Sequence, residues 1–174
     1  ERNHDMVRAI AELVAPHMSE EEITEKLATF TQLKHRQEII ATKNDVVYVS
    51  DVLSTAPIAV LMAVDDFSLR YPNATIYLLC GGADRDVQLG PLIEGLNARK
   101  DRVAAITLPE TGHMMEGKLD NAHHCDELSE AVLYVASVAK SGDVVLLAPG
   151  APSFHRYQNY EELSQHFEGF VTKL

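Results

Sequence analysis

Cysteine is scarce in this sequence, and long apolar runs are missing. Cys80 and Cys125 are the only cysteines among 174 residues, too few for the disulfide framework of a small secreted protein. No apolar stretch approaches the roughly 20 residues that span a bilayer, and the N-terminus lacks the basic-then-apolar order of a signal peptide. These absences favour a cytoplasmic protein without a membrane span.

Basic residues are outnumbered, because 15 Lys and Arg face 26 Asp and Glu for a formal net charge of -11. Such a surface repels phosphate backbones and anionic lipid, so nucleic acid is excluded as a partner. An anionic substrate must therefore be held by a few local basic groups and backbone N–H donors. The content of 46% hydrophobic and 24% charged residues excludes disorder and predicts a globular core.

Several motifs of catalysis are also missing. The chain contains no GxxxxGK[ST] loop, so it has no recognisable means of holding ATP phosphates by itself. A GxGxxG dinucleotide fingerprint and a GxSxG nucleophile elbow are absent too. The sequence gives no support to serine-hydrolase chemistry.

Residues 1–34 predict a helical hairpin. Apolar residues recur at helical spacing over residues 5–15, and Pro16 ends that helix. Ser19 with Glu22 is a capping-box signature that opens a second helix. Because the chain starts without Met and enters helix-like sequence almost at once, we expect it to be a piece of a longer polypeptide.

The period then changes from helix to strand. EIIAT and VVYVS flank Lys43-Asn44-Asp45 and predict a β-hairpin with a tight polar turn. Three further apolar runs are typical of strands buried on both faces of a parallel sheet: TIYLLC (75–80), VAAITL (103–108) and VVLLAP (144–149). Helix-length segments separate them, so residues 35–174 predict a Rossmann-like, doubly wound, mostly parallel α/β domain with a leading β-hairpin.

Three helix starts are predicted from capping residues. Ser54 or Thr55 can cap a helix that has a proline near its first turn. Asp126 opens another helix, and Asn159 with a glutamate three residues later opens the last.

Three loops that follow predicted strands hold groups able to bind an anion, at the edge where ligands of such sheets gather. Residues 50–55 offer hydroxyls and free N–H groups that could bind an anion. The alternative is that these residues only cap the following helix. In residues 81–86, paired glycines let backbone approach a ligand and Arg85 offers a fork of donors, or the segment is a turn with a surface ion pair. In residues 148–154, Pro and Gly fix the backbone of the loop, and Ser153 can donate a hydrogen bond to a carboxylate. The alternative is that the Ser153 hydroxyl is only solvated.

Zinc-ligand residue types also gather between His113 and Cys125. The cluster comprises His113, Glu116, His123, His124 and Cys125. Its spacing matches no familiar site, and adjacent histidines point in different directions on most backbones. We therefore expect a solvated loop here and predict no metal site.

The order of these segments resembles the C-terminal domain of the Mur ligases, and most closely the branch that adds D-glutamate. Residues 34–38 resemble the HRxE stretch between domains of that family, and residues 51–55 its DSKAT loop. Residues 81–85 resemble its GGxDK loop. LLAPGAPSFHRYQNYEE is similar to its LLSPACASFDxFxNFEE segment, which is the most specific match.

The resemblance implies an ATP- and Mg-dependent ligase of peptidoglycan precursor synthesis. A carboxylate of UDP-N-acetylmuramoyl-L-alanine would be phosphorylated, and the amine of D-glutamate would attack the acyl phosphate. Residues 1–34 would be the helical tail of the central ATPase domain, which holds most of the ATP and Mg, and residues 35–174 the C-terminal amino-acid-binding domain. The fragment alone would be inactive, and the remaining domains of the same polypeptide would be its partners.

By the same resemblance, Arg36 and Asp51 would face the nucleotide. The two carboxylates of an acidic amino acid would be held by Thr55, Arg85, Ser153 and the backbone near Tyr160.

This sequence departs from the family pattern at several positions. Leu53 stands where the DSKAT lysine would be, and Arg85 replaces the GGxDK lysine. Gln88 falls where an acidic residue is common, and Leu163-Ser164 replaces an Arg-Gly pair. The alternatives are a related ligase with another amino acid or carboxylate substrate, and a Rossmann-like binding module without catalytic capacity.

Overall fold

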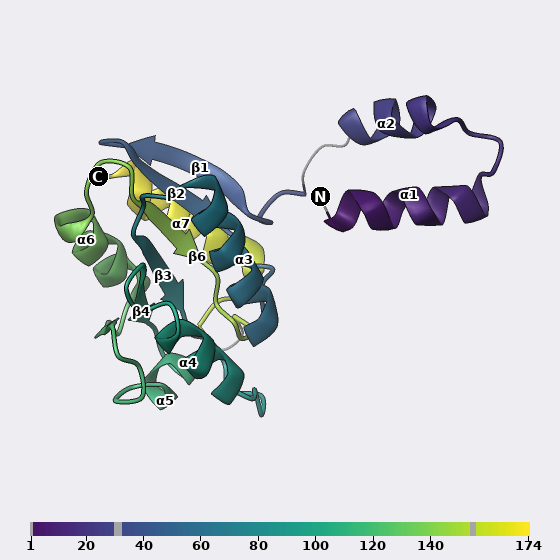
Figure 1. Ribbon diagram of the computed structural model, residues 1–174. Coiled ribbons are helices and arrows are strands. Elements are labelled where there is room, and N and C mark those ends of the chain that lie inside the picture. Colours follow the sequence, from purple (N-terminus) through teal and green to yellow (C-terminus); the bar gives the residue numbers. More distant parts are fainter. Residues whose placement is uncertain (1, 30–32, 154–155) are drawn as a thin grey trace. The chain divides into compact units, whose positions relative to one another are not determined.

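A six-stranded sheet organises residues 34–174 (Figure 1). The computed structural model describes residues 2–29, 33–153 and 156–174, and the chain forms two compact units, residues 1–33 and 34–174. The spatial order of the strands is β1-β2-β6-β3-β4-β5. Their bounds are β1 Glu38–Lys43, β2 Val46–Ser50, β3 Ile76–Cys80, β4 Val103–Thr107, β5 Ala122–His124 and β6 Val144–Leu147. Only the β1–β2 pair is antiparallel among the described strands, which confirms the predicted fold class.

The turn between β1 and β2 is left-handed. Asn44 and Asp45 have φ values of 50° and 65°, the conformation of a two-residue hairpin turn whose twist matches that of the strands. Asn and Asp tolerate this conformation better than other residues with a Cβ. The polar turn predicted from the sequence is therefore confirmed, with Lys43 paired to Val46.

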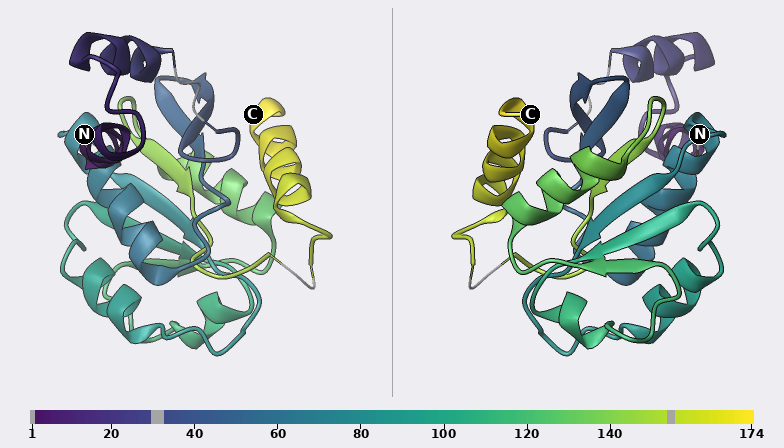
Figure 2. Two further views of the ribbon diagram at one scale, coloured as in Figure 1. Left: turned by 90° about the vertical axis from the view of Figure 1, so that its right-hand side faces the viewer. Right: turned by 90° about the vertical axis from the view of Figure 1, so that its left-hand side faces the viewer.

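Helices cover both faces of the sheet (Figure 2). On one face, α3 (Pro57–Arg70) and α4 (Gly90–Asn97) pack against an apolar cluster that includes Leu146. On the other, α6 (Leu128–Val138) and α7 (Tyr160–Thr172) pack against a cluster that includes Leu147. Because successive side chains of a strand point to opposite faces, a continuous apolar run supplies both clusters.

Two of the three predicted helix starts are wrong in detail. The residue before α3 is Ala56, which caps nothing with its side chain, because the Ser54 hydroxyl donates to Asp51 instead (2.6 Å). Helix α6 follows Glu127 rather than Asp126, again without a side-chain cap. The third prediction is confirmed, since Asn159 Oδ1 accepts from the Glu162 N–H at 2.9 Å.

The segment from 111 to 125 is more ordered than a solvated loop. It forms the short helix α5 (Thr111–Met114) and strand β5, which pairs with β4 through Ala105–Ala122 and Thr107–His124. The prediction was wrong because a three-residue strand that contains two histidines has neither the length nor the β-branched composition of a strand signal.

Residues 2–29 form the predicted helical hairpin, α1 (Arg2–Val14) and α2 (Glu20–Ala28). The capping box is complete, because the Ser19 N–H donates to Glu22 Oε2 (2.8 Å) and the Glu22 N–H donates to Ser19 Oγ (3.2 Å). Ile23 is buried, whereas Leu13 is 82% exposed.

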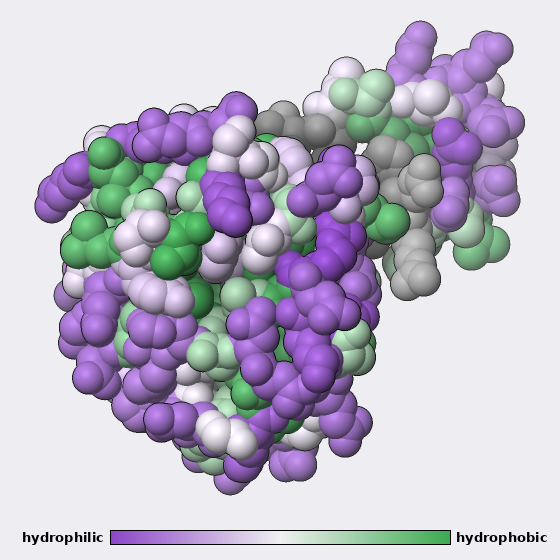
Figure 3. All heavy atoms as spheres, turned by 60° about the vertical axis from the view of Figure 1, so that its left-hand side comes forward, coloured by the Kyte–Doolittle hydropathy of each residue, from purple (hydrophilic) through white to green (hydrophobic). Residues whose placement is uncertain are grey.

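The face of the molecule in Figure 3 is mainly hydrophilic over residues 34–174, with apolar side chains between the polar ones. Acidic residues exceed basic ones in the chain as a whole. Across the described residues, no helix combines the length and the apolar character that crossing a membrane requires.

Candidate functional site

Four loops meet at the carboxyl edge of the sheet. They follow β2, β6, β3 and β4, which are neighbouring parallel strands, so their carboxyl ends lie side by side. Main-chain hydrogen bonds join the loops: the N–H groups of Gly150, Gly81 and Ala83 donate to the carbonyls of Ser54 (2.8 Å), Pro149 (2.8 Å) and Pro152 (2.7 Å). The three loops singled out in the sequence therefore form one connected edge.

Gly81 and Gly82 allow this close approach. Gly81 has a φ of 136°, and a Cβ there would overlap the Leu108 carbonyl. A Cβ on Gly82 would lie 2.5 Å from the Pro152 carbonyl oxygen. These glycines let neighbouring loops touch, and both also line the pocket described next. The predicted approach of their backbone to a ligand stays a prediction.

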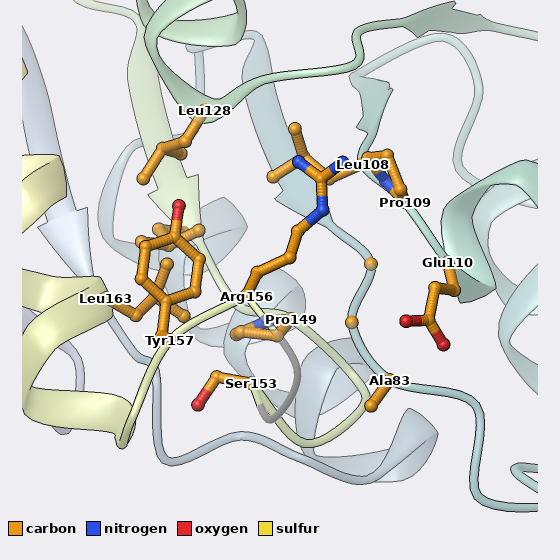
Figure 4. Close-up of a pocket in the computed structure, with 13 residues that line it drawn as sticks. Ala83, Leu108, Pro109, Glu110, Leu128, Pro149, Ser153, Arg156, Tyr157 and Leu163 are labelled. Atoms are coloured by element: carbon orange, nitrogen blue, oxygen red, sulfur yellow. The ribbon is translucent and has the colours of Figure 1, made fainter.

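A pocket opens between the loops after β3, β4 and β6 and the starts of α6 and α7, with an empty volume of about 460 Å³ that includes space open to solvent (Figure 4). Leucine side chains line its apolar part: Leu108, Leu128, Leu147 and Leu163. Its polar lining includes Glu110, Ser153, Arg156 and Tyr157. An apolar hollow with a few convergent polar groups is the usual form of a small-molecule site.

Arg156 is the cation of this pocket lining. Its Nη1 donates to the main-chain oxygen of Asp126 (2.7 Å) and to Glu127 Oε1 (3.2 Å). These two hydrogen bonds fix the position of the guanidinium beside the pocket. Burial raises the pKa of the neighbouring Tyr157, with the Glu127 charge acting in the same direction, so its hydroxyl is a neutral hydrogen-bonding group at physiological pH.

Asp51 lies beneath the edge and is fully buried. Its Oδ1 accepts from the Gln37 N–H (3.1 Å) and its Oδ2 from the Ser54 hydroxyl (2.6 Å). Burial raises the pKa of the Asp51 carboxyl, while these hydrogen bonds and the nearby Arg36 charge act against the increase. Asp51 thus joins the segment before β1 to the loop after β2.

A series of side-chain hydrogen bonds also holds the segment before β1 in place. The His35 Nδ1 lies 2.8 Å from the Ser164 hydroxyl, which is also 2.8 Å from the Ser50 hydroxyl. The His35 N–H donates to Glu38 Oε2 at 2.7 Å. These bonds connect the loop at residue 35 to β2 and α7.

The predicted site residues fall into separate groups. Ser153 lines the pocket, whereas Thr55 and Arg85 lie exposed on adjoining loops and are not part of its described lining. Arg36 is near Asp51. Tyr160, at the start of α7, packs edge-on against the His35 ring with 6.1 Å between centroids. The ligand roles assigned to these residues stay predictions.

Three polar residues of the pocket were not among the predicted site residues: Glu110, Arg156 and Tyr157. Glu110 follows the β4 run, so the rule that ligands gather at carboxyl ends of strands could have found it. Arg156 and Tyr157 belong to the most specific motif segment, where a cation between aromatic residues was the available signal.

The histidine cluster is only partly assembled. His113 and His124 meet Asp126, a residue that the sequence analysis left out of the cluster. His123 instead stacks on Tyr134, with 3.6 Å between ring centroids and 5° between planes, so the two adjacent histidines do point in different directions. Burial raises the pKa of the Cys125 thiol to about 11, which disfavours the thiolate that a metal would need.

Comparison with known protein families shows to which family this chain belongs. Residues 35–151 match the family described as "Mur ligase, glutamate ligase domain". The chain belongs to the Mur ligase family. This match covers the four loops of the carboxyl edge as far as Ala151.

Two relatives show the same Mur ligase relationship. The chain is 34% identical over 146 residues to UDP-N-acetylmuramoyl-L-alanine--L-glutamate ligase of Salinispora tropica, covering 81% of this chain and 31% of the relative. It is 32% identical over 182 residues to UDP-N-acetylmuramoylalanine--D-glutamate ligase of Salinibacter ruber, covering 98% and 37%. The chain thus spans about a third of the length of these relatives.

The fold recurs in a solved structure, E. coli FolC in complex with DHPP and ADP. The TM-score is 0.66 and the identity 20%, over 95% of this chain and 38% of that one. At this identity the likeness shows that the Mur ligase chain shares its fold with FolC.

Proposed function

We propose that this chain is the glutamate-binding part of an ATP-dependent ligase of peptidoglycan precursor synthesis, which joins D-glutamate to UDP-N-acetylmuramoyl-L-alanine. The observation that carries the proposal is the family match over residues 35–151. In this proposal, residues 35–174 are the amino-acid-binding domain and residues 1–34 the tail of the ATPase domain.

The proposed reaction has two steps. The precursor carboxylate attacks the γ-phosphate of ATP and ADP leaves, and then the glutamate amine attacks the acyl carbon, releases phosphate and loses a proton. Positioning and charge neutralisation account for most of such catalysis. This chain would contribute the position of the amine.

The pocket chemistry supports an amino acid as ligand. Arg156 and Ser153 offer donors for a carboxylate, and Glu110 offers an acceptor for an ammonium or amine group. Arg85 lies on the loop whose glycines form part of the pocket, so we propose that it holds the second carboxylate. Local donors of this kind are what a chain with a net charge of -11 needs in order to hold a dianion.

ATP and Mg would be held mainly by parts of the relatives that have no counterpart in these 174 residues. The sequence lacks a phosphate-binding loop. In this proposal Asp51 faces the nucleotide, held in place by hydrogen bonds from Gln37 and Ser54. We propose that Arg36 adds a positive charge near the nucleotide.

A chimera tests the proposal. Residues 35–174 would replace the matching part of the Salinibacter ruber relative, and the unsubstituted relative would be the control. We expect ADP and phosphate release only when UDP-N-acetylmuramoyl-L-alanine and glutamate are both present, with the ligated product seen by mass spectrometry. D- and L-glutamate are tested separately, because relatives named for each isomer match this chain.

Other outcomes of the chimera experiment separate the alternatives. ATP turnover that needs no amino acid and yields no ligated product would defeat the proposal. Turnover with a different amino acid would indicate a related ligase, and a folded chimera that binds nucleotide without turnover would indicate a non-catalytic module.

Within an active chimera, Arg85→Ala tests the proposed contact with the second carboxylate. Losing a hydrogen bond to a charged group costs about 1.5–3 kcal/mol, so we expect the KM for glutamate to rise about tenfold or more. Lys100→Ala is the control, because Lys100 is exposed before β4, at the opposite edge of the sheet. Equal KM values for the two variants would remove Arg85 from the site.

A further inference from the structure

Two imidazoles and one carboxylate converge beside the last strand of the sheet. His113 belongs to α5, His124 ends β5, and Asp126 follows it before α6. The Nε2 atoms of His113 and His124 lie 3.7 and 3.8 Å from Asp126 Oδ1. One candidate ligand atom from each residue lies within 4.8 Å of the other two. Helix α5, the end of β5 and the link that follows it thus present nitrogen and oxygen ligands to one point.

Thr107 orients one of these imidazoles. Its buried hydroxyl on β4 lies 2.9 Å from His124 Nδ1, and the two residues are register partners across the β4–β5 pair. When that hydroxyl accepts the Nδ1 hydrogen, the Nε2 lone pair is directed toward Asp126. Metal-binding histidines are typically held in this way through the ring nitrogen that does not bind the ion.

The distances suit an ion better than direct hydrogen bonds. Good N–H···O bonds extend to about 3.2 Å, so the two contacts to Asp126 are too long to satisfy these groups. Zinc–nitrogen bonds of about 2.0–2.1 Å in a tetrahedron separate ligand atoms by about 3.3 Å. The two contacts to Asp126 Oδ1 exceed that separation by only a few tenths of an ångström, and His113 and Asp126 are exposed, so their side chains have room to adjust.

We propose that His113, His124 and Asp126 bind one divalent transition-metal ion of the zinc type. Two imidazoles with a carboxylate suit Zn²⁺, whereas Mg²⁺ and Ca²⁺ prefer oxygen ligands alone. The Asp126 side chain is 79% exposed, so solvent can supply the remaining ligand. The negative net charge of the chain favours the approach of a cation.

The ion would hold two walls of the pocket together. His113 lies three residues after Glu110, and the main-chain oxygen of Asp126 accepts from Arg156 at 2.7 Å. Leu128, two residues further, also lines the pocket. The proposed ion is therefore structural, and it is independent of the ligase function proposed above.

The 174-residue chain, freed of any histidine tag and of metal, provides the test. Zn²⁺ would be titrated by calorimetry, and Co²⁺ would be titrated by its visible absorption. We expect one ion per chain with a Kd below about 10 μM and a higher unfolding temperature in the presence of Zn²⁺, since binding to the folded state stabilises it.

Variants assign the ion to these residues. We expect His113→Ala, His124→Ala and Asp126→Asn each to weaken binding at least about tenfold, and Thr107→Val to weaken it about 10–100-fold. His123→Ala is the matched control, because His123 adjoins His124 but stacks on Tyr134; it should change the Kd less than about twofold. Circular dichroism of each variant would check that it is folded.

Two results would overturn the proposal. One is the lack of saturable Zn²⁺ binding by the folded chain. The other is binding that His124→Ala and Asp126→Asn leave unchanged, which would show that other histidines, such as the exposed His166, take the ion.

Discussion

Gly82 shows how a single residue shapes the edge of the sheet. Its N–H donates to the Thr111 hydroxyl (3.0 Å), and its carbonyl accepts from the N–H groups of Glu110 (3.1 Å) and Thr111 (2.9 Å). On its other side lies the Pro152 carbonyl, within 2.5 Å of where a Cβ would be. A residue between two backbones, with every main-chain group bonded, has no room for a side chain.

We therefore expect Gly82→Ala to destabilise the chain. Overpacking costs about 1–3 kcal/mol in the free energy of unfolding, measured by urea denaturation. Gly90→Ala is the control, since Gly90 begins α4 and nothing lies within 4 Å of a Cβ there. Equal stabilities of the two variants would show that the loops after β3 and β6 separate easily.

At the scale of elements, the apolar runs predicted the parallel strands, because strands buried on both faces leave a continuous signal. Short elements were missed: β5 has three residues and α5 has four, and tertiary contacts rather than periodicity hold them. The capping predictions failed where a polar residue had a better tertiary partner, as Ser54 has in Asp51. The pocket escaped prediction because spacing along the chain does not give the conformation of the three loops that line it.

The stability of variants at the starts of α7 and α3 tests which residues cap these two helices. Asn159→Ala should lower the free energy of unfolding by about 1 kcal/mol, because the start of α7 loses the acceptor for the Glu162 N–H. Thr55→Ala should change it by less than about 0.5 kcal/mol, since Thr55 is exposed and does not cap α3. A substantial loss in Thr55→Ala would restore the capping role predicted from the sequence.

At the scale of the whole molecule, the two apolar clusters of the described chain lie within residues 34–174. Phe67 and Phe167, both fully buried, belong to one cluster each, on opposite faces of the sheet. The helical hairpin of residues 2–29 has its own capping box and its own contact, from Arg8 to Thr24.

A chain of residues 34–174 should consequently fold alone. We expect cooperative thermal unfolding within a few degrees of that of the 174-residue chain, because no member of either cluster is removed. Loss of the cooperative transition on deleting residues 1–33 would show that the hairpin supports the sheet.

The bonds from Gly150, Gly81 and Ala83 that join the loops after β2, β3 and β6 run between main-chain atoms, and this has an evolutionary consequence. Side chains at positions such as Leu53, Arg85 and Gln88 can be exchanged while the carbonyls and amides that join the loops stay in register. At the amino-acid site proposed above, selectivity would then change by point substitution without disturbing these main-chain bonds. Libraries randomised at these three positions should contain mostly folded members, which would allow selection for new preferences at the proposed amino-acid site.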